Sequence, residues 1–403
     1  MGIVKRWHGR GLGLVAALGV AVLSACGGGD PADATAGASV AKPLSAQAAL
    51  GERIFSDTSL SASGRQACAS CHVPANGHAS DNALAAQLGG ADGSLQGSRL
   101  APAIRYLASN RAFAFGADGT PTGGFFWDGR ASSLADQAGG PLLNPLEMAL
   151  GSKAELVVKI AQAPYAEEFK RVFGADILAR PDDAFERIKL ALQRYQQEDP
   201  DFAPFSSKYD GFLRGSAALT GPELRGLALF NNPAKGNCAG CHPSGKAADG
   251  SLPLFTDFTY DNLGVPRNDE LTHNADPAYF DLGLCARPDG SLAARTDLCG
   301  AFKVPSLRNV AGRKAYFHNG RFKSLKDALT FYVQRDTSPE RFYPRRADGS
   351  VDKFNDLPAA FKANVNTREA PYNRKPGDAP ALTDAEIDEL IAFLNTLSDG
   401  YQK

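Results

Sequence analysis

Apolar residues recur every three to four positions in several segments, and this spacing places them on one face of a helix. Thr220 with Glu223, and Thr383 with Glu386, form capping-box patterns that begin two of these segments, and the second ends at Gly400. No run of alternating apolar and polar residues indicates a strand. The pattern predicts a mainly α fold, and the 42 glycines and 25 prolines predict long loops. The clearest helical segments are 156–162, 182–197 and 383–399.

The first 25 residues have the pattern of a signal peptide. Lys5, Arg6 and Arg10 precede an apolar stretch, 11–23, that is too short to span a bilayer comfortably. It ends in "LSAC", which resembles a bacterial lipobox, so lipidation is expected at Cys26; the alternative is an ordinary signal peptide with a chance cysteine.

A tether and a location follow from this interpretation. The glycine-rich residues 26–45 predict a flexible tether. We expect the protein on the periplasmic side, anchored by lipid to a bacterial membrane. The residue after Cys26 is Gly27, which favours the outer membrane.

Length and charge limit the number of domains and the possible functions. A chain of 403 residues is about right for two domains. The formal net charge is −1 and no block of like charges occurs, which argues against a nucleic-acid-binding surface.

The strongest chemical signal in the sequence is the five-residue motif C-x-x-C-H, which occurs twice. This spacing attaches haem c through two thioethers and places the histidine next to the iron. A redox dithiol or half of a zinc site would not explain the histidine after both pairs. Two covalently bound haems are predicted, one in each of two cytochrome-c-like domains, 46–215 and 216–403. The motifs are Cys68-Ala69-Ser70-Cys71-His72 and Cys238-Ala239-Gly240-Cys241-His242.

Two further cysteines, Cys285 and Cys299, belong to neither motif. Exported proteins meet an oxidising environment, so the pair is predicted to form a disulfide. Two separate buried thiols are the alternative.

The numbers of histidines and methionines limit which side chains can bind the two irons. His72 and His242 supply one axial ligand each, and the usual opposite ligand in an electron carrier is methionine. The chain has only Met1 and Met148, and Met1 leaves with the signal peptide, so at most one haem has His/Met ligation. One iron with an open position is the economical interpretation, and it indicates chemistry rather than electron transfer alone.

Several stretches together resemble the bacterial dihaem cytochrome c peroxidase/MauG family. The resemblance covers residues 45–400 and implies a peroxide-dependent oxidoreductase with haem domains at each end of the chain. Besides the two haem motifs, the stretches are "FFWDGRASSLADQAGGPLLNPLEM" (125–148), "FKVPSLRNV" (302–310), "AYFHNGRFKSL" (315–325) and "DALTFYVQR" (327–335).

The resemblance assigns roles around the first haem. Gln137, Pro141 and Glu147 correspond to the family's peroxide-handling pocket, and Trp127 to the tryptophan between the haems. Splitting H₂O₂ needs a base that takes a proton from one oxygen and returns it to the other, and a desolvated carboxylate suits this. Without the haem motifs, a helix-capping glutamate and a core tryptophan would be the simpler interpretation.

At the second haem the resemblance points to the MauG branch. The peroxidase branch has a methionine 14 residues after the histidine of "YFHDG"; here that histidine is His318 and the matching residue is Tyr332, as in MauG. His242/Tyr332 ligation is therefore implied, with Lys303 and His318 at the cofactor. A buried helix face in "TFY" is the alternative for Tyr332.

The chain also departs from the family. Between residues 74 and 100 the only histidine is His78, too close to His72 to match the peroxidase branch's distal histidine, which predicts an open first haem. Gly236 replaces the surface tryptophan from which MauG oxidises its partner.

The family's calcium between the haems is a further departure. It uses an asparagine side chain and two backbone carbonyls. Here Leu100 takes the asparagine place, with Arg313 and Ala315 at the carbonyl positions, which puts calcium in question.

The segment 336–378 is longer than a usual connection, and such loops are often functional. It resembles the extended C-terminal region of the methanobactin-associated MauG relatives; a surface insertion is the alternative.

Three functions are compatible with the sequence. The favoured one is a MauG-like enzyme that stores two oxidising equivalents from H₂O₂ across both haems and oxidises an exported partner protein. The second is a peroxidase that takes electrons from a small cytochrome or cupredoxin. The third, a non-catalytic cytochrome, is disfavoured by Gln137 and Glu147.

Overall fold

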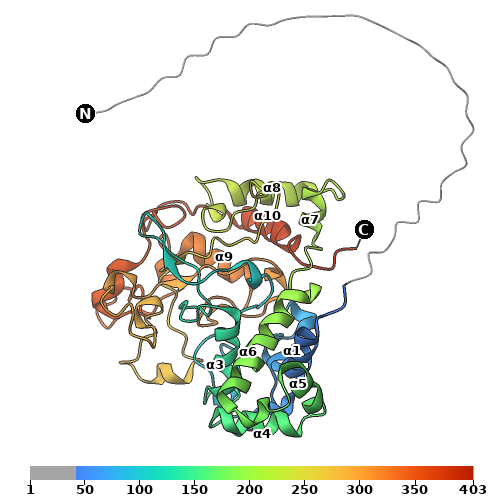
Figure 1. Ribbon diagram of the computed structural model, residues 1–403. Coiled ribbons are helices and arrows are strands. Elements are labelled where there is room, and N and C mark those ends of the chain that lie inside the picture. Colours follow the sequence, from blue (N-terminus) through green and yellow to red (C-terminus); the bar gives the residue numbers. More distant parts are fainter. Residues whose placement is uncertain (1–41, 403) are drawn as a thin grey trace, which may run out of the picture. The chain divides into compact units, whose positions relative to one another are not determined.

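The computed structural model describes residues 42–402, and the chain from Pro43 onward forms one compact unit (Figure 1). The predicted mainly α fold is confirmed, because the only strands of the described residues are three two-stranded antiparallel pairs. The helices are α1 (Ala46–Ser56), α2 (Cys68–Cys71), α3 (Leu134–Leu143), α4 (Lys153–Gln162), α5 (Ala166–Phe173), α6 (Pro181–Glu198), α7 (Lys208–Leu213), α8 (Gly221–Asn231), α9 (Leu325–Gln334) and α10 (Asp384–Asn395). The strands are β1 (Leu88–Gly89) with β2 (Leu95–Gln96), β3 (Ala114–Phe115) with β4 (Pro121–Thr122), and β5 (Tyr260–Asp261) with β6 (Phe302–Lys303).

The helices predicted from apolar spacing are present. Both capping boxes form, at the starts of α8 and α10. The predicted end at Gly400 is wrong, because α10 ends at Asn395. Thr396 follows it, and its hydroxyl donates to the carbonyl of Phe393 at 2.6 Å, a local hydrogen bond that competes with further helix. Leu397 is still buried, beyond the helix.

Two separate apolar cores correspond to the two halves of the chain. The first extends from Leu50 to Phe202 and the second from Tyr209 to Leu397. In Figure 1, α1 and α3–α6 gather at one end and α7, α8 and α10 at the other. The predicted domain boundary at residue 215 stays a prediction, since one compact unit contains both cores.

Each core contains a helix pair that touches through a glycine. A side chain at Gly51 of α1 would collide with the carbonyl of Ala191 in α6. A side chain at Gly226 of α8 would collide with the carbonyl of Glu389 in α10. The same close contact therefore packs one helix pair in each half, because only glycine lets the backbones approach this closely.

The compact unit begins before residue 46. Leu44 packs against the first core, and the hydroxyl of Ser45 accepts the amide of Ala48 and so caps α1. The last residues of the predicted tether thus belong to the fold. The signal peptide and Cys26 lie outside the described residues.

A third apolar cluster joins the segment 336–378 to the second half. Tyr343, Phe354, Leu357 and Val365 pack there with Phe331 of α9. This segment is therefore built into the fold and is not a loose surface insertion.

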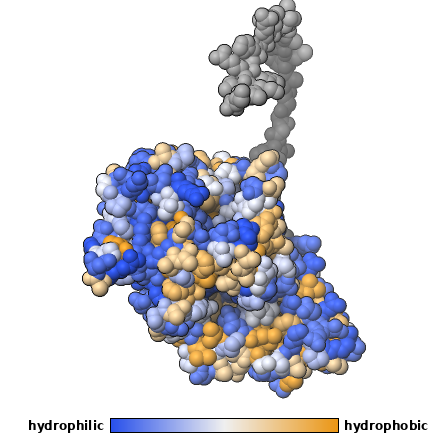
Figure 2. Space-filling view, turned by 90° about the vertical axis from the view of Figure 1, so that its left-hand side faces the viewer, coloured by the Kyte–Doolittle hydropathy of each residue, from blue (hydrophilic) through white to orange (hydrophobic). Residues whose placement is uncertain are grey.

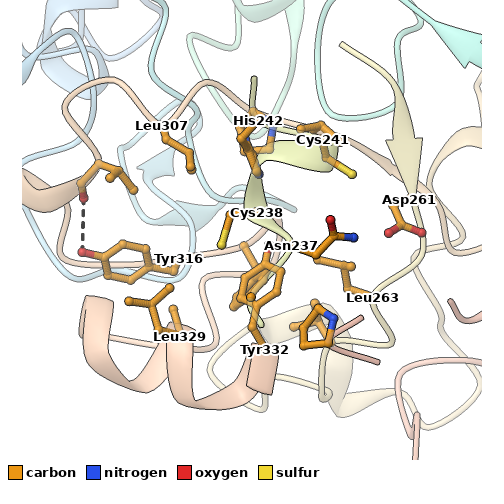
Figure 3. A pocket seen from close by; sticks show the side chains of 18 of the residues that line it. Asn237, Cys238, Cys241, His242, Asp261, Leu263, Leu307, Tyr316, Leu329 and Tyr332 are labelled. Atoms are coloured by element: carbon orange, nitrogen blue, oxygen red, sulfur yellow. Dashed lines mark hydrogen bonds between the residues drawn. The ribbon is translucent and has the colours of Figure 1, made fainter. Parts of the chain in front are cut away.

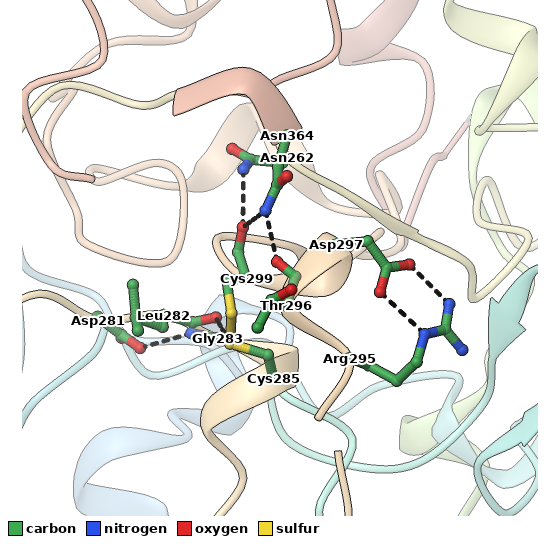
Figure 4. Close-up of a disulfide and its surroundings, with 10 residues drawn as sticks. All are labelled: Asn262, Asp281, Leu282, Gly283, Cys285, Arg295, Thr296, Asp297, Cys299 and Asn364. Atoms are coloured by element: carbon green, nitrogen blue, oxygen red, sulfur yellow. Dashed lines mark hydrogen bonds and ion pairs between the residues drawn. A yellow bond between two sulfur atoms is a disulfide. The ribbon is translucent and has the colours of Figure 1, made fainter. Parts of the chain in front are cut away.

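A disulfide between Cys285 and Cys299 lies beside this segment (Figure 4). The carbonyl of Cys299 accepts hydrogen bonds from the side chains of Asn262 and Asn364, each at 3.1 Å. Asn364 comes from the long segment, so the disulfide loop helps to fix it.

The surface mixes hydrophilic residues with smaller hydrophobic patches on the face shown in Figure 2. Within residues 42–402, no helix has both the length and the apolar character needed to cross a membrane.

Candidate functional site: two haem motifs

A cavity in the second half brings together the second haem motif and residues from distant parts of the chain (Figure 3). Cys238, Cys241 and His242 line it from the turn that begins with the 3₁₀ helix Cys238–Gly240. Trp127 and Tyr332 line it as well. The structure therefore brings into one cavity several site residues predicted from the sequence, and two of them, Trp127 and Tyr332, lie more than 200 positions apart.

His242 is oriented by its backbone surroundings. Its Nδ1 lies 2.7 Å from the carbonyl oxygen of Phe255, which fixes the ring and leaves Nε2 as the free nitrogen. Burial lowers the pKa of His242, so the imidazole is neutral at physiological pH. A neutral, oriented imidazole is the form that binds a metal.

Tyr332 lies on α9 among aromatic rings. Its ring centroid is 5.4 Å from that of Phe317. Burial, together with the nearby thiols and the carboxylate of Asp261, raises the pKa of Tyr332. The phenol therefore keeps its proton unless a cation enters the cavity, and ferric iron is such a cation.

These donors fit a c-type haem. The cavity offers two thiols, a free imidazole nitrogen and a buried phenol, and its wall includes the apolar residues Leu329, Leu390 and Leu394. Among residues 42–402, no methionine lines it, and Met148 is buried in the first core. Counting methionines limited His/Met ligation to one haem at most, and the lack of a methionine in this cavity agrees with the Tyr332 ligand that the family resemblance implies for the second haem.

The segment 336–378 also reaches this cavity, which sequence reasoning missed. Glu369, Pro371 and Tyr372 line it. The Tyr372 ring lies 6.1 Å from the Tyr332 ring, and the guanidinium of Arg335 lies 4.4 Å from its centre. Only the aromatic character of "APYNR" within a polar stretch could have indicated this role.

The first haem motif lies on α2 and the residue after it. Cys68, Cys71 and His72 are half-buried. The amide of Gln66 donates to Cys71 Sγ at 3.6 Å and to the carbonyl of Leu88 at 2.9 Å. Burial lowers the pKa of His72 to about 4, so this imidazole is also neutral, and its Nδ1 is enclosed without a hydrogen-bond partner. Two thiols and a neutral imidazole again fit haem c.

Glu147 lies close to this first motif. Its charge is among the causes that raise the pKa values of Cys68 and Cys71. Burial raises the pKa of Glu147 itself, against the opposing effects of Arg130 and of a 2.8 Å hydrogen bond from Asn144 Nδ2. A carboxylate with a raised pKa is suited to accept and return a proton. Asn144 holds it in place, and sequence reasoning missed that residue.

Gln137 and Pro141 lie one turn apart on α3, so they share a face of that helix. Both are half-buried. The carbonyl of Pro141 accepts the amide of Met148 at 3.1 Å, which folds the chain back after the helix and positions Glu147. Within the described residues, no hydrogen bond joins Gln137 to Glu147.

His78 is a core residue. Its Nδ1 accepts a hydrogen bond from Arg105 Nε at 3.3 Å, and its ring lies 4.1 Å from that of Phe202. The side chain is fully buried in these contacts. This agrees with the expectation that His78 is not a distal ligand.

Trp127 connects the two halves. Its Nε1 donates to the carbonyl of Leu100 at 2.8 Å, and its own carbonyl accepts the amide of Lys303 at 2.9 Å. The amide of Leu100 in turn donates to the carbonyl of His318 at 2.8 Å. The tryptophan is 8% exposed, so it is held rigidly where the first half meets the second cavity.

Lys303 and His318 line the same cavity. The ammonium of Lys303 donates to the carbonyl of Gly124 at 2.8 Å, and burial lowers its pKa to about 8. The His318 ring stacks on Phe302 at 3.5 Å, and burial lowers its pKa to about 3. His318 is thus a neutral wall residue.

Similarity to known proteins agrees with this geometry. Residues 45–218 match the di-haem cytochrome c peroxidase family. The methylamine utilization protein MauG of Paracoccus denitrificans is 36% identical over 88% of this chain and 89% of its own. The chain belongs to the dihaem cytochrome c peroxidase/MauG family.

Two further relatives of this family support the assignment. The diheme peroxidase BthA of Burkholderia thailandensis superposes with a TM-score of 0.82 at 41% identity, covering 89% of this chain and 87% of that one. The cytochrome c551 peroxidase of Nitrosomonas europaea is 33% identical over 70% of this chain and 71% of its own. Membership implies two c-type haems and an H₂O₂-dependent oxidoreductase of the dihaem peroxidase type, which works with a redox partner protein.

Proposed function

We propose that this protein is MauG-like within its family: its fully ferric form reacts with H₂O₂, holds both oxidising equivalents, and uses them to oxidise an exported partner protein. The observation that carries the proposal is Tyr332, which lines the cavity of His242 where no methionine of the described residues is present. A phenolate ligand is anionic and disfavours reduction of the iron, so prior reduction by a donor is not the natural way to start the reaction.

Bound haems would supply the redox chemistry. His72 would hold the iron of the first haem, and His242 with Tyr332 the iron of the second. Glu147 takes a proton from the peroxide oxygen that binds and returns it to the oxygen that leaves as water. Asn144 holds the Glu147 carboxylate through its 2.8 Å hydrogen bond. Gln137 orients the peroxide from α3, beside Pro141, and Trp127 links the two sites electronically.

A second function, reduction of H₂O₂ with electrons from a small cytochrome or cupredoxin, is favoured by the 33% identity to a cytochrome c551 peroxidase. The two functions differ in what starts the reaction. A donor-driven enzyme waits for an electron at its second haem, whereas a MauG-like enzyme does not.

Stopped-flow mixing of the ferric protein with one equivalent of H₂O₂ separates them. We expect the absorption bands of both haems to change without any reductant. If nothing changes until ascorbate reduces the second haem, the donor-driven peroxidase replaces the MauG-like proposal. No reaction in either state would leave only an electron carrier.

We also propose covalent attachment through Cys68 and Cys71, and through Cys238 and Cys241. Haem should stay with the chain after acid–acetone extraction, and a Cys238→Ala/Cys241→Ala variant should keep one haem. Loss of all haem to the solvent from the unmodified protein would contradict this.

The location proposed is the periplasmic side of a bacterial membrane, with a lipid on Cys26. The full chain should fractionate with membranes and a Cys26→Ser variant with the periplasm. Identical fractionation of the two would argue for an ordinary signal peptide.

A further inference from the structure

Arg313 is a half-buried cation whose side chain makes no hydrogen bond or ion pair in the described part of the chain. It follows the 3₁₀ helix Val310–Gly312 and lines the second cavity. Its Nε is enclosed and has no hydrogen-bond partner. No hydrogen bond or ion pair of its side chain occurs among residues 42–402, although most other enclosed arginines there have one; Arg308, for example, is paired with Asp210 at 2.8 Å.

The position of Arg313 is also close to the first motif. Its positive charge is among the causes that lower the pKa of His72. The turn that carries it packs against the residues after that motif: a Cβ added to Gly312 would lie 3.3 Å from Asn76 Oδ1, and one added to Gly77 would lie 3.1 Å from Asn309 Cβ. Arg313 therefore lies where the two haem sites meet.

A guanidinium in such a place favours a nearby anion. Withdrawing part of a charge from water without a partner is unfavourable, and an ion pair offsets that cost. Burial lowers the pKa of Arg313 only to about 10, so the group stays charged at neutral pH. The anions that a bound haem brings into these cavities are its two propionate carboxylates, and a guanidinium binds a carboxylate through two parallel hydrogen bonds.

We propose that Arg313 binds a haem propionate at the junction of the two haem sites and supplies there the fixed positive charge that relatives obtain from calcium.

The backbone oxygens around this position support the same conclusion. The carbonyl of Leu100 accepts Trp127 Nε1 at 2.8 Å, and the carbonyl of Arg313 accepts the Tyr316 hydroxyl at 2.8 Å. Leu100 offers no side-chain oxygen. Calcium prefers six to eight oxygen ligands, and a neighbouring guanidinium repels it. The residues present therefore do not fit calcium, and the arginine takes over its charge.

The inference needs only the two haems and not the reaction proposed above, so failure of the peroxide reaction would leave it standing. The test uses the haem-loaded protein and three variants: Arg313→Met removes the charge, Arg313→Lys keeps it, and Lys314→Met removes the neighbouring exposed charge as a matched control. Reduction potentials are measured by spectroelectrochemistry, and metal content by mass spectrometry after treatment with EGTA.

We expect Arg313→Met to lower the reduction potential of at least one haem, because loss of a nearby cation favours the ferric form. Arg313→Lys and Lys314→Met should shift it far less. EGTA should leave the spectra unchanged, with much less than one calcium per chain. Unchanged potentials of both haems in Arg313→Met would overturn the proposal. So would one calcium ion per chain whose removal alters the haem spectra, and this measurement holds even if Arg313→Met fails to load haem.

Discussion

The two C-x-x-C-H motifs have the same chemistry in sequence and different surroundings in space. Nδ1 of His242 lies 2.7 Å from the carbonyl of Phe255, whereas Nδ1 of His72 is enclosed without a partner. A hydrogen bond at this nitrogen makes the imidazole a stronger ligand. The second imidazole is therefore the more firmly oriented of the two, although the backbone carbonyls of His78 and Pro102 lie near enough to His72 to raise its pKa against the effect of burial.

The neighbours differ even more. The second cavity contains a buried phenol, Tyr332, and apolar helix residues. The first motif has a carboxylate, Glu147, with a raised pKa and an amide that holds it. One motif thus has a buried phenol in its cavity, as the proposed iron ligand requires, and the other has a carboxylate suited to move protons. The same C-x-x-C-H spacing is predicted to attach a cofactor at both sites, while the surroundings differ.

Exchanging Tyr332 for methionine should have the largest effect, because it would make the second site resemble a donor-driven peroxidase. We expect Tyr332→Met to keep two haems but to lose the reaction of the ferric form with H₂O₂, regaining it after reduction. Stopped-flow spectra with and without ascorbate measure this. An unchanged low-spin spectrum in Tyr332→Met would remove Tyr332 as a ligand.

Replacing the proton carrier of the first site comes next. Glu147→Gln should slow the reaction with H₂O₂ by about 10² or more, the usual scale for an acid–base group. Because the carboxylate is the active form and its pKa is raised, the rate of the unmodified protein should fall as the pH drops through that raised pKa. Glu167→Gln, at an exposed position of α5, is the control. Equal rates for the two variants would contradict the assignment.

Removing the disulfide should disturb the second haem site and leave the first unchanged. Gly300, next to Cys299, lines the second cavity. A loop of this size stabilises by about 3 kcal/mol, so Cys285→Ser/Cys299→Ser should lower the free energy of unfolding by that amount, measured with urea. A peptide map without reduction should show the linked pair in the unmodified protein. A change confined to the first haem's spectrum would argue against this division.

Removing Trp127, the proposed electronic link between the two haem sites, should have a smaller effect on the reaction of peroxide at the first haem. Trp127→Phe keeps an aromatic ring but loses the hydrogen bond to the carbonyl of Leu100. Peroxide should still react at the first haem, while the change at the second haem becomes slower. Rapid-scan spectra resolve the two bands. If both bands still change together at the original rate, Trp127 is not the link.

The smallest effect is expected from Asn144→Ala. The variant loses a hydrogen bond to the charged form of Glu147, so the pKa of the Glu147 carboxyl should rise further. The acid limb of the pH–rate profile should move to higher pH, while the rate at high pH stays nearly the same. A uniform loss at every pH would indicate a role other than holding Glu147.

Local sequence patterns determined much of the fold. Capping boxes and apolar spacing predicted α8 and α10, because these signals depend on residues three to four positions apart. The predicted helix end at Gly400 was wrong, because the helix ends at Asn395, beside a side-chain hydrogen bond of Thr396 on which apolar spacing carries no information.

The sequence by itself also indicated the cofactor, because C-x-x-C-H is a chemical requirement within five residues, and counting methionines limited His/Met ligation to one haem at most; covalent attachment stays a prediction. Only the tertiary structure decided which side chains surround each motif. Tyr332 and Tyr372 line the same cavity as His242, and Arg313 Nε is enclosed there without a hydrogen-bond partner. The two tyrosines and His242 lie from 40 to 130 positions apart in the sequence, and their meeting depends on how the helices and loops pack rather than on any local spacing.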